Sequence, residues 1–343
     1  MNNKIRKTNP EGKVIETLDA HTAGEPLRLI TKGLPDIPGN TILEKRRFFR
    51  RNYDHIRTGL MWEPRGHADM YGAVLTEPVS KQADFGVFFL HNQGYSTMCG
   101  HAVIALAKMT LDTEIIKKQG NSPEIKMDTP AGLIRTIAYR EKGSVTHVSF
   151  LNVPSFVYMK DQRVQVPGLG WVNYDIAFGG AFYAFCKVEE LDVTLKPKHF
   201  YRLVSLGRSI KKTVMSSVDI KHPQEEELGF LYGTIITGPP EKPSNHSRNV
   251  CVFADGEVDR SPTGTGVSAR AAIHYSRGEI KKGEVLIIES LIGTEFKVSI
   301  KEVTEFGPYT AVIPEVTGSA SIIGENKYYF DPNDPLKKGF ILR

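Results

Sequence analysis

Most of the chain alternates short apolar runs with Gly, Pro and Asn, a pattern that is typical of β-strands. Strands rich in Val, Ile and Phe are expected at residues 83–90, 147–153, 175–185, 249–255, 284–293 and 310–316. Two longer apolar stretches, residues 100–111 and 264–276, predict one helix each. The first of them, GHAVIALAKM, is apolar on most sides, which favours a helix surrounded by sheet. Residues 41–60 are amphipathic and predict a helix with one solvated face.

The two apolar helices belong to segments that resemble each other. The segments are FLHNQGYSTMCGHAVIALAKM (89–109) and FADGEVDRSPTGTGVSARAAI (253–273), and they align at a constant offset of 164 residues. The alignment places Cys99 opposite Thr263. A weaker pair begins at Asp19 (DAHTAGEPLRLI) and Asp175 (DIAFGGAFYAFC), where a polar stretch and a Gly lead into a strand-like run. Similarity at about half the chain length predicts two mostly β halves of one architecture, expected at residues 1–165 and 166–343.

Composition narrows the class of protein. The 343 residues carry a net charge of +5, with 40% hydrophobic and 24% charged residues, as is ordinary for a soluble globular protein. The basic clusters are short and lack interleaved aromatic residues, so nucleic-acid binding is not expected. No apolar run approaches the roughly 20 residues of a membrane span, and residues 1–19 lack the apolar core of a signal peptide. Three cysteines give no disulfide framework, and a cytoplasmic location is expected.

Both apolar helices begin at Gly-rich turns. The free N–H groups and the dipole at a helix start bind anions, and two starts related by the repeat are expected to converge on one small anion such as a carboxylate. Cys99 lies at the first start, where we expect a lowered thiol pKa and a role as nucleophile or base. A cysteine taken alone is most often a small buried hydrophobe, and this is the expectation for Cys186 and Cys251, which lie in strand-like runs.

Two polar residues lie beside this predicted anion site. His101, two residues after Cys99, is expected to contact the ligand, and a structural histidine is the alternative. Asp259 precedes the second helix by a few residues and is expected to face a substrate ammonium, with a role as N-cap or turn residue as the alternative. A carboxylate on the helix starts and an ammonium on Asp259 together describe an amino acid.

Other motifs leave their roles open. In EPRGHADMYGAV (63–74) and HTAGEP (21–26), the polar residues either line the site or stabilise turns; they are His67, Asp69, His21 and Glu25. No cluster has zinc spacing, no phosphate loop or dinucleotide fingerprint is present, and no lysine lies in a context that suggests a Schiff base. We therefore expect chemistry without a metal or another cofactor.

The chain resembles the proline racemase family. Four ordered motifs carry the resemblance, namely HTAGEP (21–26), EPRGHADMYGA (63–73), MCGHAVIA (98–105) and DRSPTGTG (259–266). The resemblance implies an α+β fold of two pseudo-symmetric halves, each a β-barrel-like sheet around a central helix as in diaminopimelate epimerase, with the active site in the cleft between them. It also implies a homodimer, and residues from about 318 to 343 are expected to pack back on the first half.

The resemblance also implies roles for single residues. Family racemases use two cysteines, one at each helix start, to remove and return the Cα proton; here these positions are Cys99 and Thr263. The implied ligands of the substrate carboxylate are the backbone N–H groups of Gly100, His101, Gly264 and Thr265. Asp259, with the ring of His101, is expected to hold the imino nitrogen.

Thr263 favours chemistry on one face of the substrate. A hydroxyl is far too weak an acid and base to replace a thiol, whose ordinary pKa is about 8.5. The Cys–Thr pair resembles the family members that dehydrate trans-3-hydroxy-L-proline, so the expected reaction is a cofactor-free elimination of water that gives Δ1-pyrroline-2-carboxylate, with Cys99 as the base. One alternative is a proline racemase or 4-hydroxyproline 2-epimerase in which water or another side chain replaces the missing thiol. Another is an imino-acid binding protein without catalysis.

Overall fold

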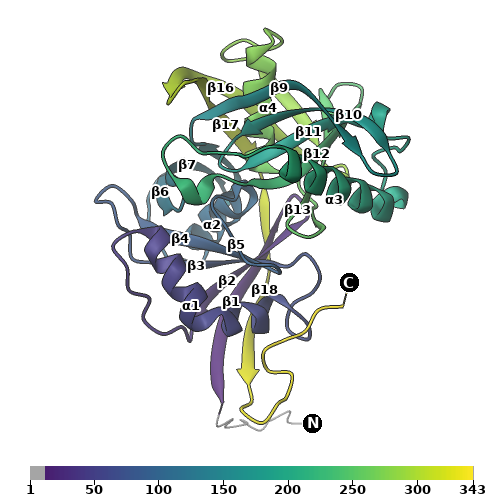
Figure 1. The fold of residues 1–343 in the computed structure, drawn as a ribbon. Helices are drawn as coiled ribbons and strands as arrows, with labels where there is room; N and C mark the ends of the chain where they lie inside the picture. The colour runs from purple at the N-terminus through teal and green to yellow at the C-terminus, as the bar shows by residue number, and fades with distance from the viewer. Residues whose placement is uncertain (1–11, 343) are drawn as a thin grey trace.

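The computed structural model describes residues 12–342 of the chain. Residues 1–11 lie outside the described residues. They include most of residues 1–19, for which no signal peptide is expected. Figure 1 shows two halves stacked on each other, one coloured purple to blue and one teal to green, with the yellow C-terminal segment beside the first half. The predicted α+β architecture of two similar halves is confirmed.

The first half is built around the helix α2. Its elements are β1 (Lys13–Thr22), β2 (Glu25–Lys32), α1 (Ile42–Met61), β3 (Tyr71–Thr76), β4 (Phe85–His91), β5 (Tyr95–Ser96), α2 (Gly100–Asp112), β6 (Glu124–Thr129), β7 (Gly132–Glu141) and β8 (Ser144–Leu151). The last strand of the chain, β18 (Ala320–Phe330), returns to this half and pairs with β1 in antiparallel fashion along the whole of β1. In Figure 1 the yellow β18 lies beside the purple β1.

The second half is built around the helix α4. Its elements are β9 (Ser155–Val166), β10 (Gly170–Phe178), β11 (Phe182–Lys187), η1 (Val188–Glu190), η2 (Pro197–His199), α3 (Phe200–Ser217), η3 (Glu226–Leu228), β12 (Leu231–Gly238), β13 (Ser247–Phe253), β14 (Glu257–Asp259), α4 (Gly264–Ser276), β15 (Val285–Glu289), β16 (Glu295–Phe306) and β17 (Tyr309–Gly318). The pairing of β17 with β9 closes the strands of this half around α4. β17 also pairs with β8, which joins the two halves through one continuous sheet.

The division between the halves expected at residues 165–166 stays a prediction. The strand β9, which ends at Val166, pairs with β10 and packs against α4.

The two central helices are buried because they are apolar on nearly all sides. Of the residues of α2, only Lys108 and Asp112 are not buried, and α4 is buried from Gly264 to Ile273. Strands surround both helices, as the apolar sequence of the first one predicts. The amphipathic helix predicted at residues 41–60 is α1, whose N-cap Thr41 accepts a hydrogen bond from the N–H of Glu44 at 3.1 Å.

One predicted element is wrong, and one helix was not predicted. The single strand expected at residues 175–185 is a hairpin, because β10 ends before a turn at Gly179 and Gly180 and β11 runs back along it. Gly180 has φ +104, a conformation that residues with a Cβ rarely adopt. The helix α3 is not among the predicted elements, although its buried residues recur at helical spacing, at Leu203, Leu206, Gly207, Ile210 and Val214.

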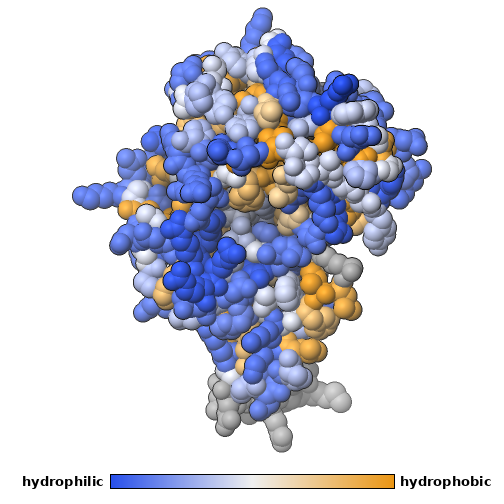
Figure 2. Space-filling view, viewed as in Figure 1, coloured by the Kyte–Doolittle hydropathy of each residue, from blue (hydrophilic) through white to orange (hydrophobic). Residues whose placement is uncertain are grey.

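The surface is mostly polar on the face drawn in Figure 2, with apolar side chains gathered beside the C-terminal segment. Leu336 and Leu342 of that segment are exposed. Among the residues that the structure describes, no helix combines the length and the apolar character needed to cross a membrane.

Candidate active site

The starts of α2 and α4 meet at the junction of the two halves. A Cβ on Gly100 would lie 2.6 Å from the Cα of Gly264, and a Cβ on Gly264 would lie 2.7 Å from the Cα of Gly100. Such distances are too short for any side chain, so only glycine at both positions lets the two backbones approach this closely. The N–H groups of a first helical turn have no partner within the helix. The contact therefore gathers two sets of free donors at one point.

A small cavity lies at this junction. Its walls are Tyr71, Met98, Cys99, Gly100, His101, Tyr183, Tyr232, Cys251, Phe253, Asp259, Thr263, Gly264 and Thr265, all of them buried. Its volume is about 20 Å³, room for about one water molecule. All the residues to which the sequence assigned catalytic or binding roles line this cavity.

Cys99 is the N-cap residue of α2. Its Sγ accepts the N–H of Ala102 at 3.4 Å and lies 3.1 Å from Nδ1 of His101. Burial raises the pKa of the Cys99 thiol well above its ordinary value, and the nearby Asp259 and Glu25 carboxyls raise it further, while the Ala102 N–H lowers it. The expectation of a lowered thiol pKa is therefore wrong for the empty cavity, because desolvation outweighs the effect of the helix start.

Thr263 occupies the matching position before α4 in a different conformation. Its φ is +68, which is unusual for a β-branched residue, and its side chain makes no N-cap hydrogen bond. The buried hydroxyl lies close enough to the Asp259 carboxyl and the Cys251 thiol to lower their pKa values, yet it completes no hydrogen bond among the described residues. The Thr263 hydroxyl therefore lies at the cavity wall and does not cap α4.

The groups expected to hold the imino nitrogen lie on the other side of the cavity. Asp259 accepts the N–H of Ser261 at 2.7 Å, and burial raises the pKa of the Asp259 carboxyl to about 6. Burial lowers the pKa of His101 to about 3, against a hydrogen bond to the carbonyl of Pro26 that favours the charged ring. At neutral pH the wall therefore presents a carboxylate and a neutral imidazole.

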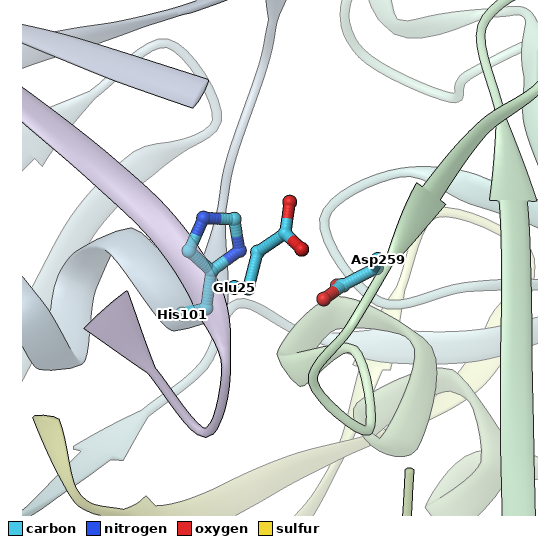
Figure 3. A group of neighbouring side chains, drawn as sticks. All are labelled: Glu25, His101 and Asp259. Atoms are coloured by element: carbon cyan, nitrogen blue, oxygen red, sulfur yellow. The ribbon is translucent and has the colours of Figure 1, made fainter. Parts of the chain in front are cut away.

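Glu25 joins these two residues, although it is not part of the cavity wall. Figure 3 shows the side chains of Glu25, His101 and Asp259 converging from different elements. One acceptor atom of each lies within 4.8 Å of the others. Glu25 is completely buried, and its Oε2 accepts the backbone N–H of Arg260 at 2.7 Å. Glu25 thus lies beside His101 and Asp259, outside the cavity wall.

The other motif residues divide between the site's supports and the surface. Asp69 is buried and pairs with Arg260 at 3.3 Å, so the motif at residues 63–73 supports the segment that carries Asp259. His21 accepts the N–H of Gly24 at 3.3 Å and belongs to the turn between β1 and β2. His67 is exposed and contacts the carbonyl of Ala68. Neither histidine lines the cavity.

Sequence reasoning missed the part of the wall made by β-strands. Cys251, expected in the core, is buried but lines the cavity beside Thr263 and Asp259. In the register of β13 and β14, Cys251 lies opposite Asp259. The signal was the Asp255–Gly256 pair, a hairpin turn dipeptide whose flanking strands bring these two residues together. Tyr71, Tyr183, Tyr232 and Phe253 complete the wall and carry no motif of their own.

Comparison with known proteins agrees with this geometry. The sequence model of the proline racemase family matches residues 17–341. The chain belongs to the proline racemase family.

Two relatives are similar to this protein along nearly its whole chain. The protein from Colwellia psychrerythraea named trans-3-hydroxy-L-proline dehydratase is 48% identical over 329 residues, which are 96% of this chain and 93% of that protein. The protein from Burkholderia multivorans named 3-hydroxyproline 2-epimerase is 43% identical over 96% of this chain and 98% of its own length.

A solved structure has the same fold. The crystal structure of a hydroxyproline epimerase from Agrobacterium vitis, with bound trans-4-hydroxy-L-proline, superposes with a TM-score of 0.91. It is 29% identical and covers 96% of this chain and 95% of that chain. The chain thus shares its fold with a protein whose crystal structure contains trans-4-hydroxy-L-proline.

Proposed function

We propose that this member of the proline racemase family is a trans-3-hydroxy-L-proline dehydratase, a hydro-lyase that forms Δ1-pyrroline-2-carboxylate. The observation that carries the proposal is the Cys99–Thr263 pair, one thiol and one hydroxyl at two helix starts in contact. Two-base racemisation needs a second acid of matched pKa. The name of the Colwellia relative, at 48% identity, supports the same reaction.

The substrate's stereochemistry fits a single base. In trans-3-hydroxy-L-proline the carboxylate and the hydroxyl lie on opposite faces of the ring, so the Cα hydrogen and the hydroxyl share one face. The Cys99 thiolate takes the Cα proton, the electrons of that bond form the C2–C3 double bond, and the C3–O bond breaks. The new thiol returns its proton to the departing hydroxide, which leaves as water. The product enamine then tautomerises to the imine.

The two helix starts supply the electrostatic part of catalysis. The N–H groups of Gly100, His101, Gly264 and Thr265 bind the carboxylate and stabilise the negative charge that spreads onto it when the Cα proton leaves. The substrate ammonium, held by Asp259 and His101, offsets the Asp259 charge that raises the pKa of Cys99. Substrate binding therefore favours the thiolate that the reaction needs.

A direct assay tests the proposal. Purified protein is incubated with trans-3-hydroxy-L-proline and the pyrroline product is followed as its imine adduct, while L-proline and trans-4-hydroxy-L-proline are examined in parallel by chiral chromatography. We expect imine from the first substrate and no inversion of the other two. Inverted L-proline without imine would contradict the dehydratase assignment.

A second candidate is Cα epimerisation of 3-hydroxyproline. The thiol of Cys251 lies in the cavity wall beside Thr263, on the side where a racemase carries its second cysteine. The Burkholderia multivorans relative, at 43% identity, is named an epimerase. Deuterium at Cα of an inverted 3-hydroxyproline after reaction in D2O, lost in Cys251→Ala, would favour this candidate.

Further properties follow the family resemblance. We propose that the protein is a cytoplasmic homodimer. Its binding partner is the small imino-acid substrate. Size-exclusion chromatography with light scattering measures the oligomeric state, and a monomeric mass would contradict the dimer.

A further inference from the structure

One carboxyl near the cavity has a free oxygen in a fully buried place. Glu25, the first residue of β2, uses Oε2 to accept the N–H of Arg260, while its Oε1 has no partner among the described residues. In Figure 3 this carboxyl lies between the ring of His101 and the carboxyl of Asp259, and one acceptor atom from each of the three residues lies within 4.8 Å of the others. The three atoms surround a point that suits a hydrogen-bond donor with a positive charge.

The three side chains around this point differ in how readily they hold a proton. Burial raises the pKa of Glu25 well above its ordinary value, the neighbouring Asp259 carboxylate raises it further, and Arg260 opposes both. The pKa of Asp259 is about 6 and that of His101 about 3. At neutral pH Asp259 is thus mostly ionised and His101 is neutral, whereas burial and the Asp259 charge both favour the protonated form of the Glu25 carboxyl.

Other charged or titratable groups face Glu25 as well. Asp69 adds to the rise of its pKa, and the thiols of Cys99 and Cys251 feel its charge. Because both thiols are buried and their pKa values are raised, they are protonated and neutral in the empty site. The Arg260 side chain, 3.8 Å from the Glu25 carboxyl, is the one cation in this set.

A secondary ammonium changes this balance. It brings two N–H donors and a positive charge to a site that has a carboxylate, a neutral imidazole and a protonated carboxyl. An opposite charge within about 5 Å lowers a carboxyl pKa by roughly 1 to 3. The group that responds is the one that still holds a proton.

We propose that Glu25 holds a proton while the site is empty and releases it to solvent when the secondary ammonium of an imino acid binds beside Asp259 and His101. The inference rests on the proposed function, which places the imino nitrogen at these residues. The bond that breaks is the O–H bond of Glu25, its electrons stay on the carboxylate, and water accepts the proton. Glu25 then acts as a positioning residue, because its negative charge keeps the nitrogen protonated while Cys99 removes the Cα proton.

Calorimetry tests this with a ligand that cannot react. L-Proline has no 3-hydroxyl group and therefore cannot lose water. We expect its binding near neutral pH to release up to one proton. The release is measured as the difference between the heats of binding in phosphate and in Tris, because these buffers differ in ionisation enthalpy. Tetrahydrofuran-2-carboxylate, in which oxygen replaces the ring nitrogen, should bind more weakly and release none.

Variants identify the source of the proton. Glu25→Gln keeps an acceptor for the Arg260 N–H but has no acidic proton, so it should bind L-proline at least about tenfold more weakly and without proton release. The matched control is Glu257→Gln, since Glu257 is also fully buried with one carboxyl oxygen unpartnered, and it pairs with His91 outside the site. Glu257→Gln and Cys99→Ser should both keep the proton release, the latter because the thiol is not its source.

The outcomes separate the two proposals. Binding of L-proline to the unmodified protein without proton release overturns this inference, as does release that persists in Glu25→Gln. If Glu25→Gln fails to fold, the two ligands still show whether release depends on the ring nitrogen, and loss of release in Cys99→Ser or Glu257→Gln overturns the inference. Proton release that depends on Glu25, without dehydration of trans-3-hydroxy-L-proline, overturns only the dehydratase. A protein that binds no imino acid overturns both.

Discussion

The two helix starts at the cavity both begin with a glycine, Gly100 or Gly264, but the residue before that glycine differs in backbone conformation and in side-chain chemistry. At the start of α2, Cys99 has an extended backbone and its sulfur accepts an N–H of the helix. At the start of α4, Thr263 has φ +68 and a hydroxyl that finds no hydrogen-bond partner within residues 12–342. The duplicated backbone can bind a carboxylate from two sides, whereas proton transfer is left to one side. The fold therefore separates binding, which needs both halves, from chemistry, which one half can supply.

The residues one position into each helix also differ in their contacts. His101 lies 3.1 Å from the Cys99 sulfur, whereas Thr265 gives its hydroxyl to a hydrogen bond with Tyr183 at 2.6 Å. The second half contributes the charged group instead, in Asp259. A change at one start is thus expected to affect a different step from the matching change at the other.

The largest effect is expected at the first start. Cys99→Ser should lower kcat for dehydration by at least about 1000-fold, because a hydroxyl cannot serve as the base at neutral pH. Binding of L-proline, measured by calorimetry, should stay within about threefold of the unmodified protein, since the carboxylate ligands are backbone groups. A variant with near-full dehydratase activity would show that Cys99 is not the base.

The matching change at the second start should add a reaction rather than remove one. Thr263→Cys places a second thiol opposite Cys99 and should produce inversion of L-proline that chiral chromatography detects above the level of the unmodified protein. Dehydration should fall by about tenfold, because a donor on the second face returns protons to Cα. Absence of any inversion would mean that the two positions do not face one ligand.

The shared backbone can be tested at its point of contact. Gly264→Ala introduces a Cβ that would lie 2.7 Å from the Cα of Gly100, so the helix starts must separate. We expect a loss of kcat/KM of at least about tenfold and a lower Tm, since overpacking typically destabilises by about 1–3 kcal/mol. Gly324→Ala is the control, because a Cβ there meets nothing within 4 Å and φ is not in the left-handed region. Equal effects of the two changes would contradict the close-contact explanation.

The smallest expected effect concerns the charged group of the second half. The pKa of Asp259 is raised to about 6, so the carboxylate is present above that pH and lost below it. We expect kcat/KM to fall by a further tenfold or so per pH unit below about pH 6, and Asp259→Asn to lack this bend. His101, with a pKa of about 3, should add no bend between about pH 4.5 and 8.5. A bend near the ordinary Asp pKa would contradict the burial effect.

The repeated helices could be predicted from sequence because local and global preferences agree there. α2 and α4 begin at the expected glycines, and their all-round apolar character follows from their place inside sheet. The prediction of a single strand at residues 175–185 was wrong because the apolar run continues across Gly179 and Gly180. The tight fit of that turn against α4, where a Cβ on Gly179 would lie 2.2 Å from the carbonyl oxygen of Thr265, is a tertiary constraint.

The candidate site could be predicted where a residue belongs to a motif. Cys99, His101, Asp259 and Thr263 all line the cavity. Cys251 could not be recognised from its own surroundings, because a thiol in an apolar strand looks like core; only the register with Asp259 reveals it. The direction of the Cys99 pKa was also beyond sequence reasoning, because it depends on how completely the cavity excludes water.

The pairing of β1 with β18 has a consequence for the order of events during synthesis. β1 is made early, yet one of its two neighbouring strands lies some three hundred residues later, at Ala320–Phe330. The first half cannot complete its sheet until that later strand has been made, and until then an open strand edge stays exposed to other chains. A strand made after the whole second half is thus the one that finishes the sheet of the first.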